Sequence, residues 1–295
     1  LASASHSALP GRVEVAIIGA GLAGLLLASV FSSACAESLA LLEKSATVGG
    51  TWRHHGNAFS RVNSSEPSYR IPVGKKQHNS NHSHRGEILF DVLRLIEQHD
   101  LVRWVHTHAA IRRVAPAIDS WCLSGLRHAA CAFQLRCSFT VLCTNRRLGS
   151  PRRISLAGEE VFGGAVLRGL GGDVNKLSCS GTRVVVLGMG AFAIENVRTS
   201  LEHGASHVTI LCRRRGTVCP QIVDWVNFIR PFDSAFRHNS AGDAIVLRHW
   251  QALYDSSGAS RPECWATEGM IKPDGHTVST SDMFFIAHSL KMHET

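Results

Sequence analysis

The sequence lacks a long uninterrupted hydrophobic run, which argues against a membrane-spanning helix. Such a helix needs about 20 apolar residues, whereas the most apolar stretch, VEVAIIGAGLAGLLLASVF at 13–31, is shorter and contains Gly19, Gly21 and Gly24. The stretch instead has an apolar strand that runs through a glycine turn into an apolar helix, as a phosphate-binding βα unit does. It therefore predicts a nucleotide site and no membrane span.

Paired cysteines are also missing. The nine cysteines form no CxxC pair and no regular framework, which favours free or buried thiols in a reducing intracellular compartment. The histidines of the polar segment 77–86 (QHNSNHSHRG) lack the fixed spacing of zinc ligands. We therefore expect no metal and interpret 77–86 as a solvated loop.

Basic stripes interleaved with aromatic residues, which would indicate nucleic-acid binding, are absent as well. The net charge is +8, but lysines and arginines are scattered along the chain. Excess positive charge also suits a protein that holds anionic dinucleotides, so we expect no nucleic-acid partner. The chain begins at Leu1, and LASASHSALPGR (1–12) has no acidic residue. This segment would suit the end of a transit peptide, which leaves organelle targeting open.

One feature recurs at long range. The segment TRVVVLGMGAFAIENVRTSLEHGA (182–205) repeats the strand, glycine turn and helix of the N-terminus, with Gly188, Gly190 and Ala193 in a GxGxxA pattern. Each unit continues into a second apolar strand, at 38–44 and at 207–215. We therefore predict an α/β fold with two Rossmann-like units and two bound dinucleotides.

The region between the two units is predicted to contain a helix and a pair of strands. Residues 85–101 show helical spacing of apolar residues, and a strand pair ends in FTVLCT (139–144). A proline-bearing crossover at 149–164 leads to the second unit. We place the domain boundary there, with a first domain over 1–155 and a second over 156–295.

The first turn has the residues that a dinucleotide requires. Its glycines permit a tight turn, a close approach of the backbone to the pyrophosphate, and packing of the helix on the strand. Glu43 follows 24 residues after Gly19, where a carboxylate can accept both hydroxyls of an adenosine ribose. The alternative is a glycine-rich core turn followed by a surface glutamate.

The second turn differs at the corresponding place. Counting 24 residues from Gly188 reaches Cys212, which is followed by Arg213, Arg214 and Arg215. Guanidinium groups bind a 2′-phosphate, which a carboxylate would repel. This pattern favours NADP(H) over NAD(H). The alternative is that the three arginines only cover a solvated loop.

The segments GAGLAG and LLEKSATVGGTWR (41–53) resemble the flavin-dependent monooxygenases, the class of the flavin-containing and Baeyer-Villiger enzymes. The resemblance covers most of 13–215 and includes the helix at 85–101 and the linker at 143–164. It implies FAD, with Glu43 on its ribose and with Gly50, Thr51 and Trp52 passing near the pyrophosphate and the flavin.

Three departures from the family pattern stand out. Thr144 and Asn145 replace a Thr-Gly or Ser-Gly pair, and the FxGxxxH fingerprint ends in Arg168 instead of histidine. The closing strand and glycine-aspartate segment of the family have no counterpart in 274–295. Asn63 lies near the position of a family asparagine that acts in the flavin's oxygen chemistry, and a turn-forming asparagine is the equal alternative.

The resemblance implies that NADPH reduces FAD and that the reduced flavin uses O₂ to oxygenate a small organic substrate. No side chain stands out as an obligatory acid or base, so no catalytic residue is named. One alternative is a degenerate flavoprotein or a structural subunit of a larger assembly. A second is a pyridine-nucleotide disulfide reductase, which Glu195 matches in spacing. That class requires a pair of close cysteines. Glu195 is otherwise read as structural, in the first turns of its helix.

Overall fold

The computed structural model describes residues 8–34, 38–64, 66–145, 154–170, 173–221, 240–267 and 278–295. The chain divides into two compact units. The first contains 1–56, 71–76 and 86–160, and the second contains 57–70, 77–85 and 161–295. The division assigns two short segments near residue 70 to the second unit, and the domain boundary at 155 stays a prediction.

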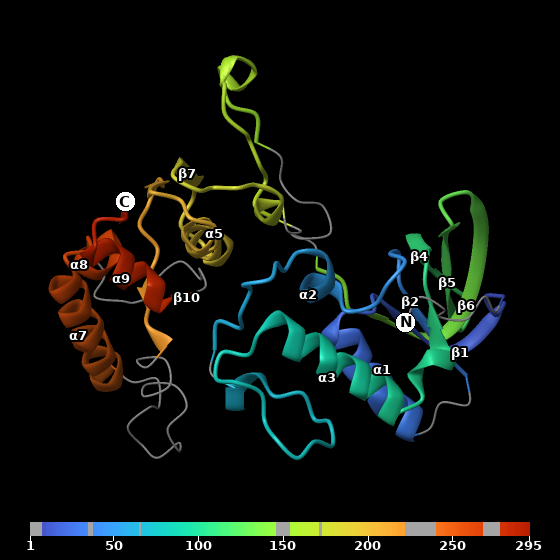
Figure 1. Ribbon diagram of the computed structural model, residues 1–295. Helices are drawn as coiled ribbons and strands as arrows, with labels where there is room; N and C mark the ends of the chain where they lie inside the picture. The colour runs from blue at the N-terminus through green and yellow to red at the C-terminus, as the bar shows by residue number, and fades with distance from the viewer. Residues whose placement is uncertain are drawn as a thin grey trace. The chain divides into compact units, whose positions relative to one another are not determined.

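The first unit is built on a six-stranded sheet with the order β3-β2-β1-β6-β5-β4. Its strands and helices, all but β3 labelled in Figure 1, are β1 (Arg12–Ile18), α1 (Leu22–Ala34), β2 (Leu39–Leu42), α2 (Gly50–His54), α3 (Arg85–Gln98), β3 (Val105–His106), β4 (Ala109–Ala117), β5 (Ser120–Arg127) and β6 (Cys131–Leu142). The predicted strands of the first βαβ unit and the helix after residue 85 are confirmed. The predicted strand pair is wrong in number, because β4, β5 and β6 form three antiparallel strands.

Strand β1 is the centre of this unit. It pairs in parallel with β2 on one side and β6 on the other, with Ile18 opposite both Leu42 and Leu142. Parallel strands are normally covered on both faces and therefore read as continuous apolar runs, and the last four residues of β1 are all buried. The register ends these three strands at one edge of the sheet, so the residues that follow each strand gather there.

The second unit contains a parallel sheet with the order β11-β8-β7 and a separate pair, β10-β9. Its strands and helices are β7 (Arg183–Leu187), α5 (Ala191–Glu202), β8 (His207–Leu211), β9 (Val218–Cys219), α7 (Ser240–Ser257), α8 (Glu263–Thr267), β10 (Ser279–Thr280), α9 (Asp282–Ser289) and β11 (His293–Glu294). Leu187 lies opposite Leu211, so β7 and β8 also end at a shared edge. The predicted strands and helix of the second βαβ unit are confirmed, except that its second strand, predicted over 207–215, ends at Leu211.

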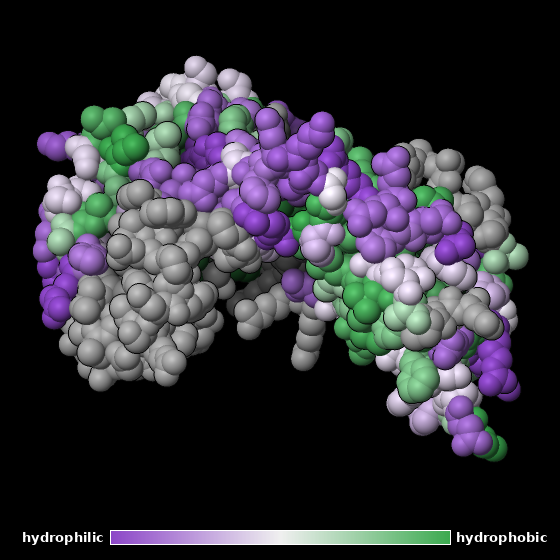
Figure 2. All heavy atoms as spheres, turned by 90° about the horizontal axis from the view of Figure 1, so that it is seen from below, coloured by the Kyte–Doolittle hydropathy of each residue, from purple (hydrophilic) through white to green (hydrophobic). Residues whose placement is uncertain are grey.

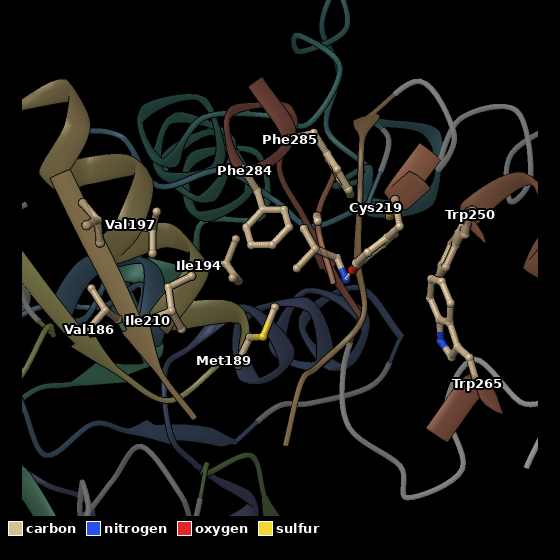
Figure 3. Packing of buried hydrophobic residues seen from close by; sticks show 14 of the residues in the cluster. Val186, Met189, Ile194, Val197, Ile210, Cys219, Trp250, Trp265, Phe284 and Phe285 are labelled. Carbon is tan, nitrogen blue, oxygen red and sulfur yellow. Dashed lines mark hydrogen bonds between the residues drawn. The ribbon is translucent and has the colours of Figure 1, made fainter. Parts of the chain in front are cut away.

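The core of the second unit joins its sheet to its helices. Figure 3 shows Val186 and Ile210 from the sheet, Ile194 and Val197 from α5, and Phe284 from α9 within one apolar cluster. Trp250 of α7 and Trp265 of α8 belong to the same cluster, with their ring centroids 6.3 Å apart. This packing fixes the strand ends and the first turn of α5, where the second glycine turn lies.

Candidate dinucleotide sites

The first glycine turn is tightly constrained by its neighbours. Gly19 follows β1 with φ 105°, and a β-carbon on it would lie 2.5 Å from the carbonyl oxygen of Cys143. A β-carbon on Gly24 would lie 1.9 Å from the carbonyl oxygen of Gly19. Since neither position has room for a side chain, α1 can approach the turn closely. The N–H groups at the start of α1 therefore face the edge where β1, β2 and β6 end.

The GGTW segment packs against this turn. The Gly49 backbone N–H donates to the Ala20 carbonyl oxygen at 2.9 Å. A β-carbon on Gly50, whose φ is 53°, would lie 2.8 Å from Gly21 Cα. The structure thus brings together two motifs that are about thirty residues apart in the sequence, with Thr51 and Trp52 half-buried in α2.

Glu43 follows β2 at the same edge, and 7% of the residue is exposed. Its Oε2 accepts a hydrogen bond from the Ala20 backbone N–H at 2.9 Å, and its Oε1 accepts one from the Ser45 N–H at 2.8 Å. A carboxylate has about four acceptor positions, so each oxygen retains the capacity to accept a ribose hydroxyl. The alternative of a surface glutamate does not fit this burial, and the contact with ribose stays a prediction.

The second glycine turn is more open. Gly188 has φ 103°, Gly190 precedes the first residue of α5, and a β-carbon added to either glycine would meet nothing within 4 Å. The third position, Ala193, packs against the apolar core of the unit. Open space in front of a helix N-terminus, reached through a strand and two glycines, suits an anionic pyrophosphate.

The arginine loop lies against this second turn. A β-carbon on Gly216 would be 2.6 Å from the Met189 carbonyl oxygen, and Cys212 Sγ is 4.0 Å from Met189 Sδ. Arg213 and Arg214 are exposed, and within the described part of the chain neither forms a hydrogen bond or an ion pair. They remain the predicted phosphate contacts.

Comparison with known proteins shows which sequences and folds this chain is similar to. No protein-family model matches the chain. The sequence is 28% identical over 214 residues to the FAD-containing monooxygenase EthA of Mycobacterium tuberculosis strain H37Rv, over 68% of this chain and 42% of EthA. The matched part thus spans less than half of the length of this curated relative.

Two monooxygenases are among the solved structures of similar fold. Oxidized steroid monooxygenase bound to NADP has a TM-score of 0.71 at 15% identity, over 96% of this chain and 65% of that one. OTEMO in complex with FAD and NADP has a TM-score of 0.68, also at 15% identity, with the same coverage.

The chain resembles the flavin-dependent monooxygenases in sequence and in fold. This confirms the resemblance predicted from the first glycine turn and GGTW, and it confirms the α/β class with two dinucleotide-binding units.

Among the family positions that differ, Arg168 and its neighbours are on the surface. Residues 161–168 are all exposed, with Phe162 at 62%. Thr144 lies beside the first turn, where its Cγ2 is 3.4 Å from the β-carbon position of Gly19. The replaced histidine therefore belongs to a surface segment, whereas the Thr144–Asn145 replacement begins next to the first glycine turn.

Asn63 is held by β10 and the residue before it. Its Oδ1 accepts from the Thr280 backbone N–H at 3.3 Å, and its Nδ2 donates to the Val278 carbonyl oxygen at 3.4 Å. The Thr280 hydroxyl donates to the Asn63 carbonyl oxygen at 2.5 Å. Oδ1 and Nδ2 of Asn63 therefore both form hydrogen bonds that hold this segment to β10. A role of Asn63 in oxygen chemistry stays a prediction.

Sequence reasoning missed a buried polar cluster around Glu195. Glu195 Oε1 accepts from the Ser60 hydroxyl at 2.6 Å and from Asn57 Nδ2 at 3.3 Å, and Asn57 Nδ2 also lies 3.2 Å from Thr199 Oγ1. Burial raises the pKa of Glu195, although the Ser60 hydrogen bond and the charge of Arg198 act in the opposite direction. The cluster fastens the segment that begins at Asn57 to α5. No local pattern in the sequence signals it.

Glu195 should link the stability of the second unit to pH. Because its folded-state pKa is raised, its stabilising contribution is full below the unfolded-state pKa and is lost as pH rises through the folded-state pKa. Glu195→Gln keeps an acceptor for Ser60 and should flatten this part of the pH profile. Glu195→Ala should cost about 1–3 kcal/mol, because the buried Ser60 hydroxyl loses its acceptor and Asn57 Nδ2 keeps only Thr199 Oγ1. Thermal unfolding at several pH values measures both, and equal profiles for the wild type and the Gln variant would contradict the assignment.

Neither a metal site nor a membrane-spanning helix is found among the described residues. They contain no group of three or more His, Cys, Asp or Glu side chains placed to hold a metal ion. None of the helices built from them is long and apolar enough to cross a bilayer. On the face shown in Figure 2, hydrophilic and hydrophobic residues are interspersed wherever residues are coloured, as is ordinary for a globular surface.

Proposed function

We propose that the chain is the dinucleotide-binding part of an FAD-dependent, NADPH-using monooxygenase that oxygenates a small organic substrate. The observation that carries this proposal is the pair of glycine turns, each followed by a helix and each at the edge where parallel strands end. Ligands of open α/β sheets bind outside the carboxyl ends of the strands. The likeness to EthA, which is FAD-containing, supports the choice of cofactor.

The first turn fits FAD. At Gly21 the nearest atom to an added β-carbon is Gly50 Cα, at 3.6 Å, so two glycines pack together and keep side chains away from the backbone that a pyrophosphate would approach. Each oxygen of Glu43 accepts one backbone N–H and would accept a ribose hydroxyl with its remaining lone pairs. FAD, when bound, supplies the electron transfer and the oxygen chemistry of such an enzyme. The residues of the chain bind it, orient its ribose and bring backbone N–H groups to its phosphates.

The second turn fits NADPH. The open space at Gly188 and Gly190 accommodates the pyrophosphate on α5. Arg213 and Arg214 extend from a loop that packs on the same turn, and their guanidinium groups can donate to a 2′-phosphate. Charge of this sign distinguishes the second site from the first, where Glu43 occupies the corresponding position.

A visible absorbance spectrum of the purified chain tests the proposal. Bound flavin gives a band near ~450 nm, as flavin cofactors do in general, and anaerobic titration with NADPH should bleach it. A yellow chain that NADPH bleaches and that consumes NADPH in air supports the proposal. A chain that stays colourless after incubation with FAD and gel filtration contradicts it.

The departures from the family pattern favour one alternative, a degenerate flavoprotein or a structural subunit of a larger assembly. Arg168 replaces the fingerprint histidine, and Asn145 replaces a glycine near the first turn. A colourless chain, or one that binds FAD and is not reduced by NADPH, would support this alternative. The disulfide-reductase alternative finds less support, because the nine cysteines of the sequence include no short-spaced pair of the kind that class requires.

A further inference from the structure

A carboxylate from α8 lies beside the arginine loop, residues 212–216. Glu263, the first residue of α8, accepts from Arg215 Nη1 through Oε1 at 2.6 Å and from the Arg215 backbone N–H through Oε2 at 3.0 Å. The Glu263 side chain is 55% exposed and that of Arg215 is 34% exposed. Both oxygens of a charged group are thus fixed beside the arginines that follow β8, although 48 residues separate the two in sequence.

The position of Glu263 does not depend on this ion pair alone. Trp265, two residues later, is 4% exposed and donates from Nε1 to Thr217 Oγ1 at 3.1 Å. Its ring packs edge-on against Tyr254, with centroids 4.9 Å apart, and the Tyr254 hydroxyl accepts from the Val218 backbone N–H. The start of α8 is therefore anchored to the chain just after the arginine loop.

Glu263 changes the charge that a nucleotide meets. Burial raises its pKa, but hydrogen bonds from backbone N–H groups and attraction to Arg215 and Arg214 outweigh this, so the pKa is lowered overall. Glu263 is therefore ionised at neutral pH. An ionised carboxylate here neutralises Arg215 and repels a 2′-phosphate, while it can accept a hydrogen bond from the free 2′-hydroxyl of NADH.

We propose that Glu263 is a specificity-determining residue of the second site, which reduces the preference for NADPH over NADH that the arginines create. The inference rests on the proposed function, because it assumes that the second turn binds a nicotinamide dinucleotide. The 2′ end of the nucleotide would then meet two exposed arginines and one ion pair. The site would accept NADH more readily than an all-arginine loop would.

Calorimetric titration of the whole chain with NADP⁺ and NAD⁺ tests the proposal without turnover. Glu263→Gln should increase the ratio of the NAD⁺ to the NADP⁺ dissociation constant by about tenfold, because one negative charge beside the phosphate is removed and Arg215 is released. The control is Asp255→Asn, which removes the same charge from another ion pair of the unit, that between Asp255 and Arg261. It should leave the ratio unchanged.

Glu263→Ala provides a second variant in which Trp265 still anchors α8. An unchanged ratio in both Glu263 variants, or an equal shift in Asp255→Asn, would overturn the inference while the proposed function stood. A wild-type chain that binds neither nucleotide would instead overturn the proposed function, and the inference with it.

Discussion

Replacing Gly21 with valine is expected to give a folded chain that no longer retains FAD. The β-carbon itself fits, because Gly50 Cα lies 3.6 Å away and Gly21 is not among the glycines with positive φ. Backbone strain is therefore not the reason for the loss. The two γ-methyl groups of valine add bulk beside Gly50, at the backbone that the pyrophosphate must approach.

The expected loss of flavin is large. Displacing the pyrophosphate from its backbone donors should weaken FAD affinity by more than about tenfold, which corresponds to ~1.4 kcal/mol, and the retained FAD should fall well below the wild-type ratio. The measurement is the flavin-to-protein absorbance ratio after gel filtration, with circular dichroism to verify folding. Gly86→Val, at an exposed position of α3 where an added β-carbon meets nothing within 4 Å, is the matched control. A folded Gly21→Val chain with the wild-type flavin ratio would show that the first turn is not the FAD site.

The double substitution of Arg213 and Arg214 by glutamine is expected to reduce NADPH affinity while leaving NADH affinity nearly unchanged. Hydrogen bonds from guanidinium to phosphate are worth about 1.5–3 kcal/mol, or roughly 10- to 150-fold in affinity. Arg215 is left in place because its Nη1 is paired with Glu263. Removing Arg215 would break its ion pair with Glu263, and the effect of that change could not be separated from the loss of a phosphate contact.

A matched control for this pair exists in the first unit. Arg112 and Arg113 are adjacent and exposed in β4, so their double glutamine variant removes the same charge from a different surface. Flavin reduction by NADPH and by NADH should be compared at one moderate salt concentration, because exposed charges are screened. An equal decrease for both nucleotides would indicate only long-range attraction, and an unchanged preference would make the two arginines a solvated loop.

The elements around both turns could be predicted because their signals are local. A buried parallel strand is an uninterrupted apolar run, and a glycine turn between strand and helix needs few residues to specify it. Glu43 and the arginine loop were found by counting from the glycines, because a βαβ unit fixes the length of chain between its two strand ends.

The features that escaped prediction depend on contacts between distant residues or on unusual turns. The turn after β5 uses His128 and Ala129 at positive φ, where glycine or asparagine would have marked a hairpin, so three strands were read as a pair. Glu263 meets Arg215 across 48 residues. The cluster of Glu195 with Ser60 joins residues 135 positions apart. No periodicity records such pairings.

The interleaving of the two units has a consequence for folding during synthesis. The first unit is complete once residue 160 has emerged, whereas residues 57–70 and 77–85 belong to a unit whose sheet is finished only by β11, at His293–Glu294. At roughly 5–20 residues per second, those segments wait on the order of ten seconds for their partners. Val62 and Ser60, which are 5% and 2% exposed in the folded chain, lack their native packing throughout this delay. Chaperone binding and misfolding of the nascent chain should therefore concentrate between residues 57 and 85.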